Sequence, residues 1–183
     1  MTKGFAATSV REIAKAAGIT SASLYHYMPS KDDLLVTVTV QATHLLADPG
    51  RVINASGGTP DERLAALIRL HVMEHARGRR LWEVADEEWR QLPARKRAPV
   101  VALRDEYQSF WERALLEGRE ADLFRFGDLK MTTFAILSMC SDVYKWFSPN
   151  GRLTAEDVAE YYLQLVAAML GAPRFAFPPA VLQ

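Results

Sequence analysis

Residues 8–35, TSVREIAKAAGITSASLYHYMPSKDDLL, constrain the fold more than any other stretch of this chain. Ser9 can cap a helix, and the carboxylate of Glu12, three residues later, can reach back to complete a capping box. Apolar residues then recur at helical spacing until Gly18, which can end the helix because glycine adopts a left-handed backbone without steric cost. The pattern therefore predicts a short helix that ends in a tight turn.

A second short helix is expected after this turn, with Thr20 as its cap, and Ser30 can cap a third. Leu24 and Met28 lie four residues apart and can face a small core. The remaining side chains of the second helix are hydroxyl groups, an alanine and aromatic rings, which have little to pack against. This arrangement indicates a helix-turn-helix whose second helix enters the major groove of DNA. The alternative is a plain helical hairpin whose small residues allow close packing.

The segment resembles the DNA-binding segment of the TetR family of bacterial transcriptional regulators. The resemblance rests on IA and AG in the first helix, LY near the end of the second, and SK at the start of the third. Met28 stands where the family usually has phenylalanine. The resemblance implies base contacts from Arg11, Ser21, Ala22, Ser23 and Tyr25, phosphate contacts from Thr8, Tyr27 and Lys31, and either kind from His26.

The family has a further helix upstream of this segment, which packs across the two short helices. Only seven residues precede Thr8 here, and residues 3–5 resemble the end of such a helix. Without it, several apolar side chains of the helix-turn-helix segment, residues 8–35, here called the head, would be partly exposed. Burying each of them is worth about 1.5–3 kcal/mol. We therefore expect that the first helix is largely absent, and that the natural translation start lies upstream of Met1 or the chain is shortened.

The charge of the chain is unevenly distributed. The whole sequence has 22 basic and 22 acidic residues, whereas residues 1–31 contain four basic residues and one acidic residue, which gives +3. A basic head on a neutral body is typical of local docking on DNA, although so few charges also fit a chance excess. Cys140 is the single cysteine, which excludes an intramolecular disulfide and fits the reducing cytoplasm. We expect Cys140 to be a buried packing residue.

Helical periodicity continues to the end of the chain, so we predict an all-α fold of two domains. Residues 1–46 would form the helix-turn-helix domain with a connecting helix from Ser30 to about Leu46, and residues 47–183 a helical ligand-binding and dimerisation domain. Residues 48–58 are rich in glycine and proline and are expected to be a linker. Further helices are expected over residues 60–77, 80–92, 94–118, 127–147 and 155–170.

The last two predicted helices are apolar on more than one side, which requires burial on more than one side. One face can pack within the domain and the other against a second subunit. Such a homodimer would place two heads on one palindromic DNA operator. The alternative is that both helices form the core of a monomer.

The second half of the chain resembles the C-terminal domain of TetR-family members that respond to fatty-acyl or steroid-derived acyl-CoA thioesters. Arg104, Tyr107, Gly118 and the WFSPNGRLTAEDVA junction carry this resemblance, while GREADLF lacks the usual second glycine. The resemblance implies a small hydrophobic or acyl-CoA-type effector.

Aromatic and methionine side chains of this half would surround a central cavity, although such residues are more often plain core. Arg104 could anchor a carboxylate or a phosphate. His71 and His75 share a helix face, but two histidines are too few for zinc, and we expect no metal and no cofactor. The predicted ligand contacts are His71, Met73, Trp82, Trp89, Arg104, Tyr107, Trp111 and Phe134.

No catalytic arrangement stands out, which argues against an enzyme. The sequence favours a cytoplasmic repressor that a small effector releases from double-stranded DNA. The alternative is a dimeric helical protein that binds small molecules and whose incomplete head grips DNA poorly. A salt-dependent gel shift would discriminate between the two, because phosphate contacts make DNA binding fall steeply with salt.

Overall fold

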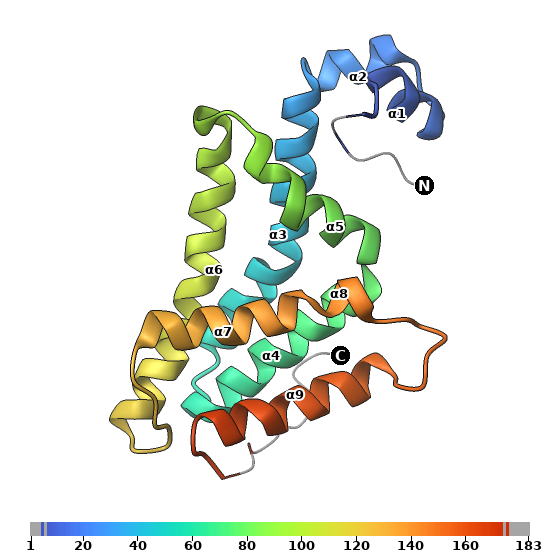
Figure 1. Ribbon diagram of the computed structural model, residues 1–183. Helices are drawn as coiled ribbons and strands as arrows, with labels where there is room; N and C mark the ends of the chain where they lie inside the picture. Colours follow the sequence, from blue (N-terminus) through green and yellow to red (C-terminus); the bar gives the residue numbers. More distant parts are fainter. Residues whose placement is uncertain (1–4, 6, 174, 176–183) are drawn as a thin grey trace.

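The computed structural model describes residues 5, 7–173 and 175, and all regular structure among them is helical (Figure 1). The predicted all-α fold is therefore confirmed. The helices are α1 (Val10–Ala16), α2 (Ser21–Tyr27), α3 (Lys31–Ala55), α4 (Pro60–Arg77), α5 (Arg79–Glu87), the 3-10 turn η1 (Glu88–Gln91), α6 (Ala94–Glu120), α7 (Leu129–Ser141), α8 (Val143–Trp146) and α9 (Ala155–Met169).

The head begins as the sequence predicts. The Ser9 amide donates to Glu12 Oε2 at 2.7 Å, and the Glu12 amide donates back to Ser9 Oγ at 3.2 Å, which forms the capping box of α1. Thr20 caps α2 by accepting from the Ser23 amide at 3.1 Å. The expectation about a helix upstream of these elements falls mainly on residues 1–4 and 6, which lie outside the described residues.

Gly18 turns the chain between α1 and α2 with a φ of +69°, and an added Cβ would meet no atom within 4 Å. Gly18→Ala should therefore cost about 1 kcal/mol through backbone strain alone. We expect amide hydrogen exchange in α1 and α2 to become about five times faster, the ratio that corresponds to 1 kcal/mol. Gly127→Ala is the matched control, because its added Cβ is equally free and its φ is ordinary. Unchanged exchange in the Gly18 variant would contradict the strained turn.

Helix α3 continues well past its predicted end. The expected linker is wrong for residues 48–55, which are helical despite Pro49 inside the helix. The reason is packing between distant segments: an added Cβ on Gly50 would lie 3.0 Å from the ring of Tyr107, so the glycine lets α3 and α6 approach closely. α3 thus crosses the boundary expected between residues 46 and 47, and the division into two domains there stays a prediction.

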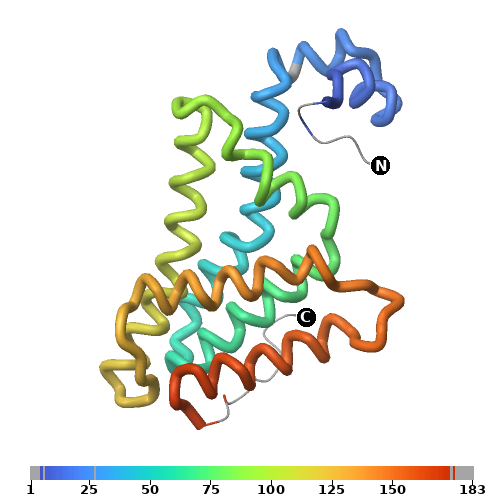
Figure 2. The backbone as a smooth tube through the Cα atoms, in the orientation of Figure 1, coloured from blue at the N-terminus to red at the C-terminus, as the bar shows by residue number. Residues whose placement is uncertain are grey.

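Helix α4 lies at the centre of the body and contacts α3, α6, α7, α8 and α9. Its buried side chains include Leu64, Leu67, Ile68 and Val72. α3 and α6 pack side by side and extend from the body toward the head, as the traces in Figures 1 and 2 show. No described helix combines the length and the apolar character that a membrane crossing requires.

The helix predicted over residues 127–147 is interrupted at Asp142. Helix α7 ends at Ser141, and the short α8 begins at Val143. This break directs residues from two short segments toward α4 and α5, since α8 contacts both of those helices. It therefore shapes the cavity described below.

Candidate nucleic-acid interface and ligand pocket

The predicted DNA contacts lie in or beside the two helices of the head, which pack against each other. Ala22, Ser23, Tyr25 and His26 of α2 are exposed, as is Arg11 of α1, whereas Ser21, Thr8 and Lys31 are partly buried. The side chain of Tyr27 lies outside what the structure describes. Which of these groups contact bases or phosphates stays a prediction.

The acidic groups of the head are engaged in caps and ion pairs. α2 has no acidic residue in its first turn, and Glu12 belongs to the capping box of α1. The side chain of Lys96 donates to Asp33 at 2.8 Å and lies 3.9 Å from Asp32. The hydrogen bonds from Lys96 and then Ser30 hold the pKa of the Asp33 carboxyl below its usual value. The exposed face of α2 is thus free of carboxylates, as binding to phosphates requires.

Polar contacts of α6 and η1 connect the head to the body. Lys96, near the start of α6, donates to Ser30 Oγ at 2.8 Å in addition to its pairing with Asp33. The backbone amide of Phe5 donates to Glu88 Oε1 of η1 at 3.1 Å. A movement of α6 or η1 would therefore act directly on the start of α3 and on the head.

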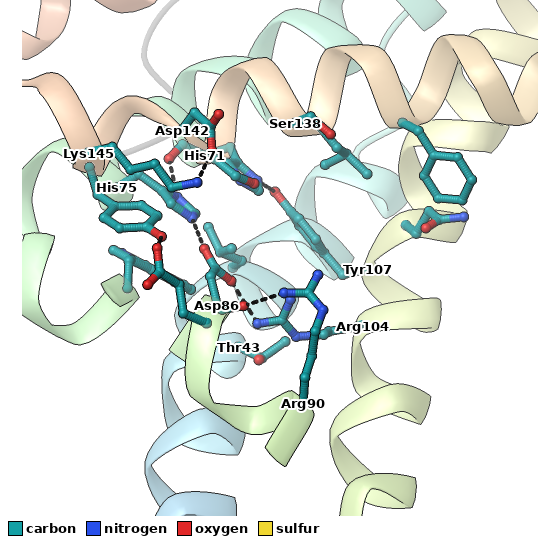
Figure 3. A pocket seen from close by; sticks show the side chains of 18 residues that line it. Thr43, His71, His75, Asp86, Arg90, Arg104, Tyr107, Ser138, Asp142 and Lys145 are labelled. Carbon is teal, nitrogen blue, oxygen red and sulfur yellow. Dashed lines mark hydrogen bonds and ion pairs between the residues drawn. The ribbon is translucent and has the colours of Figure 1, made fainter. Parts of the chain in front are cut away.

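A cavity of about 280 Å³ opens among α3, α4, α5, α6, α7 and α8 (Figure 3). Its lining includes five of the eight predicted ligand residues: His71, Trp82, Arg104, Tyr107 and Phe134. A volume near 300 Å³ is at the lower end of the range for small-molecule sites.

The other three predicted residues do not line this cavity. Trp111 is fully buried in the core, with its ring edge-on to that of His71. Met73 is half-buried against the core. Trp89 lies on η1, and its ring is 5.0 Å from the guanidinium of Arg104.

Sequence reasoning missed the polar groups that line the cavity. Asp86, Glu87 and Arg90 come from α5 and η1, while Ser138, Ser141, Asp142, Tyr144 and Lys145 come from α7, α8 and the residue between them. The sequence carries little signal for them, because each looks like an ordinary solvent-facing residue of a helix. The i, i+4 spacing of His71 and His75 was the one visible indication of a polar face.

A continuous hydrogen-bonded network forms the inner wall. The His71 ring nitrogens lie 3.2 Å from the Tyr107 hydroxyl and 3.0 Å from Ser141 Oγ. The rings of His71 and His75 stack with centroids 4.2 Å apart, and Trp82 stacks on His75 at 4.1 Å. Two histidines are thus held rigidly inside the protein.

Asp86 continues the network to α6. His75 Nε2 lies 3.2 Å from Asp86 Oδ2, and Arg104 Nη2 donates to Asp86 Oδ1 at 2.7 Å. Burial alone raises the pKa of the Asp86 carboxyl, but His75 and Arg104 outweigh it, and the pKa lies below its usual value. Burial, together with the charges of His75 and Arg104, lowers the pKa of His71 well below normal, so His71 is neutral at pH 7.

No cluster of three or more histidine, cysteine or acidic side chains suited to a metal ion occurs among the described residues. Cys140 is buried, and burial raises the pKa of its thiol, as expected of a packing residue.

Large apolar side chains are exposed on several helices of the body. Five of them lie on α7, with Met131 and Phe134, and on α9, with Tyr161, Leu165 and Met169. Met131 is 68% exposed and Tyr161 is 60% exposed, which is unusual for side chains of this size.

Comparison with known proteins identifies both halves of the chain. Residues 57–170 match the family described as "Tetracyclin repressor-like, C-terminal domain", and residues 1–38 match "Bacterial regulatory proteins, tetR family". The chain is 29% identical over 173 residues to the HTH-type transcriptional repressor KstR2 of Rhodococcus jostii. This match covers 93% of this chain and 85% of that protein. KstR2 of Mycobacterium tuberculosis is 30% identical over 168 residues, with 90% and 83% covered.

A solved structure shares this fold over nearly its whole length. The crystal structure of AibR in complex with isovaleryl coenzyme A and operator DNA is similar with a TM-score of 0.79 and 31% sequence identity. The match covers 92% of this chain and 90% of that one.

Proposed function

This chain belongs to the TetR family of bacterial regulatory proteins, and from that premise we propose how its parts act together. It is a ligand-responsive DNA-binding repressor, and its relatives are transcriptional regulators rather than enzymes. In our proposal a homodimer holds one operator through α2 of each subunit and releases it when a small effector enters the cavity. Such a protein works in the cytoplasm, where bacterial DNA lies.

The open face of α2 supports the DNA-binding part of the proposal. Short side chains such as Ala22 and Ser23 allow a helix to approach base edges, and Tyr25 can reach beyond them. Arg11 and Lys31 would contact phosphates or bases at the edges of this face. Glu12 is engaged in the cap of α1, and the ammonium group of Lys96 offsets the charge of Asp33.

The exposed apolar side chains of α7 and α9 support a homodimer. A two-fold interface uses the same surface on both subunits, and burying Met131 and Tyr161 would remove two large exposed apolar groups from water. The dimer would fix the distance between two heads, as a palindromic operator with half-sites one helical turn apart requires.

The cavity supports a small hydrophobic or acyl-CoA-type effector. AibR, which has a similar fold, has been crystallised with isovaleryl coenzyme A. The cavity of about 280 Å³ can hold an acyl group but not a whole coenzyme, which would have to extend past the mouth. Predicted contacts with the acyl group come from Trp82, Tyr107 and Phe134.

The contacts between body and head supply a route for control. Arg104 and Tyr107 line the cavity from α6, and Lys96 of the same helix holds Ser30 and Asp33. This connection carries the proposal, because a ligand that displaces α6 must also displace the head. The ligand weakens operator binding if it binds more tightly to a conformation in which the distance between the two heads does not match the operator. By thermodynamic linkage, bound DNA then lowers the affinity for the ligand by the same factor.

The experiment is a fluorescence-anisotropy titration of the full chain against labelled DNA from either side of its own gene. Six or more phosphate contacts per dimer would weaken binding by roughly 1000-fold between 50 and 200 mM salt. At fixed salt, saturating isovaleryl-CoA or hexanoyl-CoA should weaken it by at least about fivefold. A DNA affinity that does not depend on the salt concentration would instead favour the alternative, a small-molecule-binding protein with an impaired head. If neither acyl-CoA changes the affinity for the operator, control by such an effector is contradicted.

A further inference from the structure

The inner end of the cavity carries a net positive charge that follows from hydrogen-bond geometry. His75 Nδ1 lies 2.9 Å from the backbone carbonyl of His71, which can only accept, so Nδ1 carries a proton. His75 Nε2 lies 3.2 Å from Asp86 Oδ2, and a second proton must lie between these two atoms. Whether this proton is on the histidine or on the aspartate, the pair is neutral in total.

Arg104 adds one positive charge to this neutral pair. Its Nη2 donates both to Asp86 Oδ1 at 2.7 Å and to the backbone carbonyl of Ala85 at 2.6 Å. Its Nε is buried and has no hydrogen-bond partner in the described structure. The trio of His75, Asp86 and Arg104 therefore carries a net charge of +1, with donor capacity still unused.

A second guanidinium bonds to the same residue. Arg90 lines the same cavity, and Arg90 and Arg104 both donate hydrogen bonds to Asp86 (Figure 3). Both guanidinium groups approach the ring of Trp89, at 5.4 and 5.0 Å from its centroid. Arg90 donates to the backbone carbonyl of Asp86 and pairs with no carboxylate among the described residues. Two positive charges that line one cavity repel each other, and an anion placed between them would relieve this repulsion.

The remaining charges of the lining do not supply that anion. Asp142 pairs with Lys145 at 2.9 Å, and these two charges cancel. Glu87 accepts a hydrogen bond from the Tyr144 hydroxyl at 2.9 Å, on α8. The carboxylate of Glu87 offsets only one of the two arginines, so the charges of the lining sum to +1.

From this arrangement we infer that the effector carries a carboxylate at the end that enters the cavity, where Arg104 binds it from the inner wall and Arg90 from the exposed side. This deepens the proposed function and rests on it. The carboxylate could belong to a free organic acid or to the far end of a dicarboxylic acyl thioester. A purely aliphatic acyl chain would instead leave the excess positive charge of the lining unbalanced and the buried Nε of Arg104 without an acceptor, which is costly.

Two matched pairs of probes distinguish these sources by isothermal titration calorimetry at pH 7 and fixed salt. Hexanoate and hexanamide have nearly the same shape but differ in charge, and adipoyl-CoA differs from hexanoyl-CoA by a terminal carboxylate. We expect the charged member of at least one pair to bind about tenfold more tightly, as suits charge-assisted hydrogen bonds to arginine. A preference in the first pair identifies a free acid, and a preference confined to the second identifies a thioester.

Arg104→Gln should abolish this preference, and Arg90→Gln, on the exposed side of the cavity, should reduce it if the first variant folds poorly. Arg113→Gln is the control, because Arg113 is an exposed residue of α6 outside the lining. Equal binding within each pair, tighter binding of hexanoyl-CoA, or no binding of any probe would overturn the inference. Release of operator DNA by hexanoyl-CoA without a carboxylate preference would overturn it and leave the proposed function intact.

Discussion

Asp86→Asn should lower the free energy of unfolding by about 3 kcal/mol at pH 7, because an amide cannot balance the charges of two cations. The Asp86 carboxylate joins His75 and Arg104, and its side chain is only 18% exposed. Removing one member of a buried ion pair costs about 3–5 kcal/mol, and the lower end applies here because the Asp86 side chain is not fully buried. Urea unfolding followed by circular dichroism measures the loss.

The pH dependence of this loss has a definite sign. The pKa of the Asp86 carboxyl is below its usual value of 3.8 in the folded protein. A carboxyl with a depressed folded pKa contributes stability above its unfolded pKa and loses it as the pH falls through the folded pKa. The difference between the natural chain and the variant should therefore be constant from about pH 5 to pH 7 and shrink below about pH 4.

Asp142→Asn provides the control for this prediction at the same cavity. Asp142 pairs with Lys145, but both side chains are at least half exposed, and such a surface pair contributes at most about 1 kcal/mol. Equal losses for the two variants would mean that Asp86 is not the central anion of a buried network.

The sequence predicts helix starts well because caps are local. Ser9, Thr20 and Ser30 each accept the backbone hydrogen bond expected of them, and Thr154 does the same for α9. The end of α3 could not be predicted in this way. Pro49 and Gly50 look like loop residues until Tyr107 of α6 packs against Gly50, more than fifty residues away.

The candidate site shows the same difference between what local sequence predicts and what tertiary packing decides. Aromatic residues such as Trp82 and Tyr107 were predicted to surround a cavity, and both line it. Trp111 has the same character in sequence, yet it is fully buried in the core, because only tertiary packing decides which aromatic ring faces the cavity. Ser141 joins His71 from 70 residues away and Asp86 joins His75 from the next helix, so no pattern within one helix reveals the network.

Ala22→Glu should weaken operator binding by at least about 100-fold, which corresponds to about 3 kcal/mol. Ala22 is an exposed residue in the first turn of α2, and if that face enters the major groove, a carboxylate there meets phosphates and base edges in each of two heads. The change should not unfold the head, since an acidic residue near a helix N-terminus stabilises it by about 0.3–1 kcal/mol. Anisotropy at fixed salt measures the DNA affinity.

Ala121→Glu separates this effect from a general change of charge. Ala121 is exposed at the far end of α6, and Figure 1 places that end away from α1 and α2. The control adds the same charge to the chain, so any nonspecific repulsion of DNA should be similar in both variants, whereas repulsion within a groove requires the charge on α2. We expect the control to bind within about threefold of the natural chain. Equal affinity of the Ala22 variant and the control would mean that α2 does not enter the groove, and another surface would have to bind the operator.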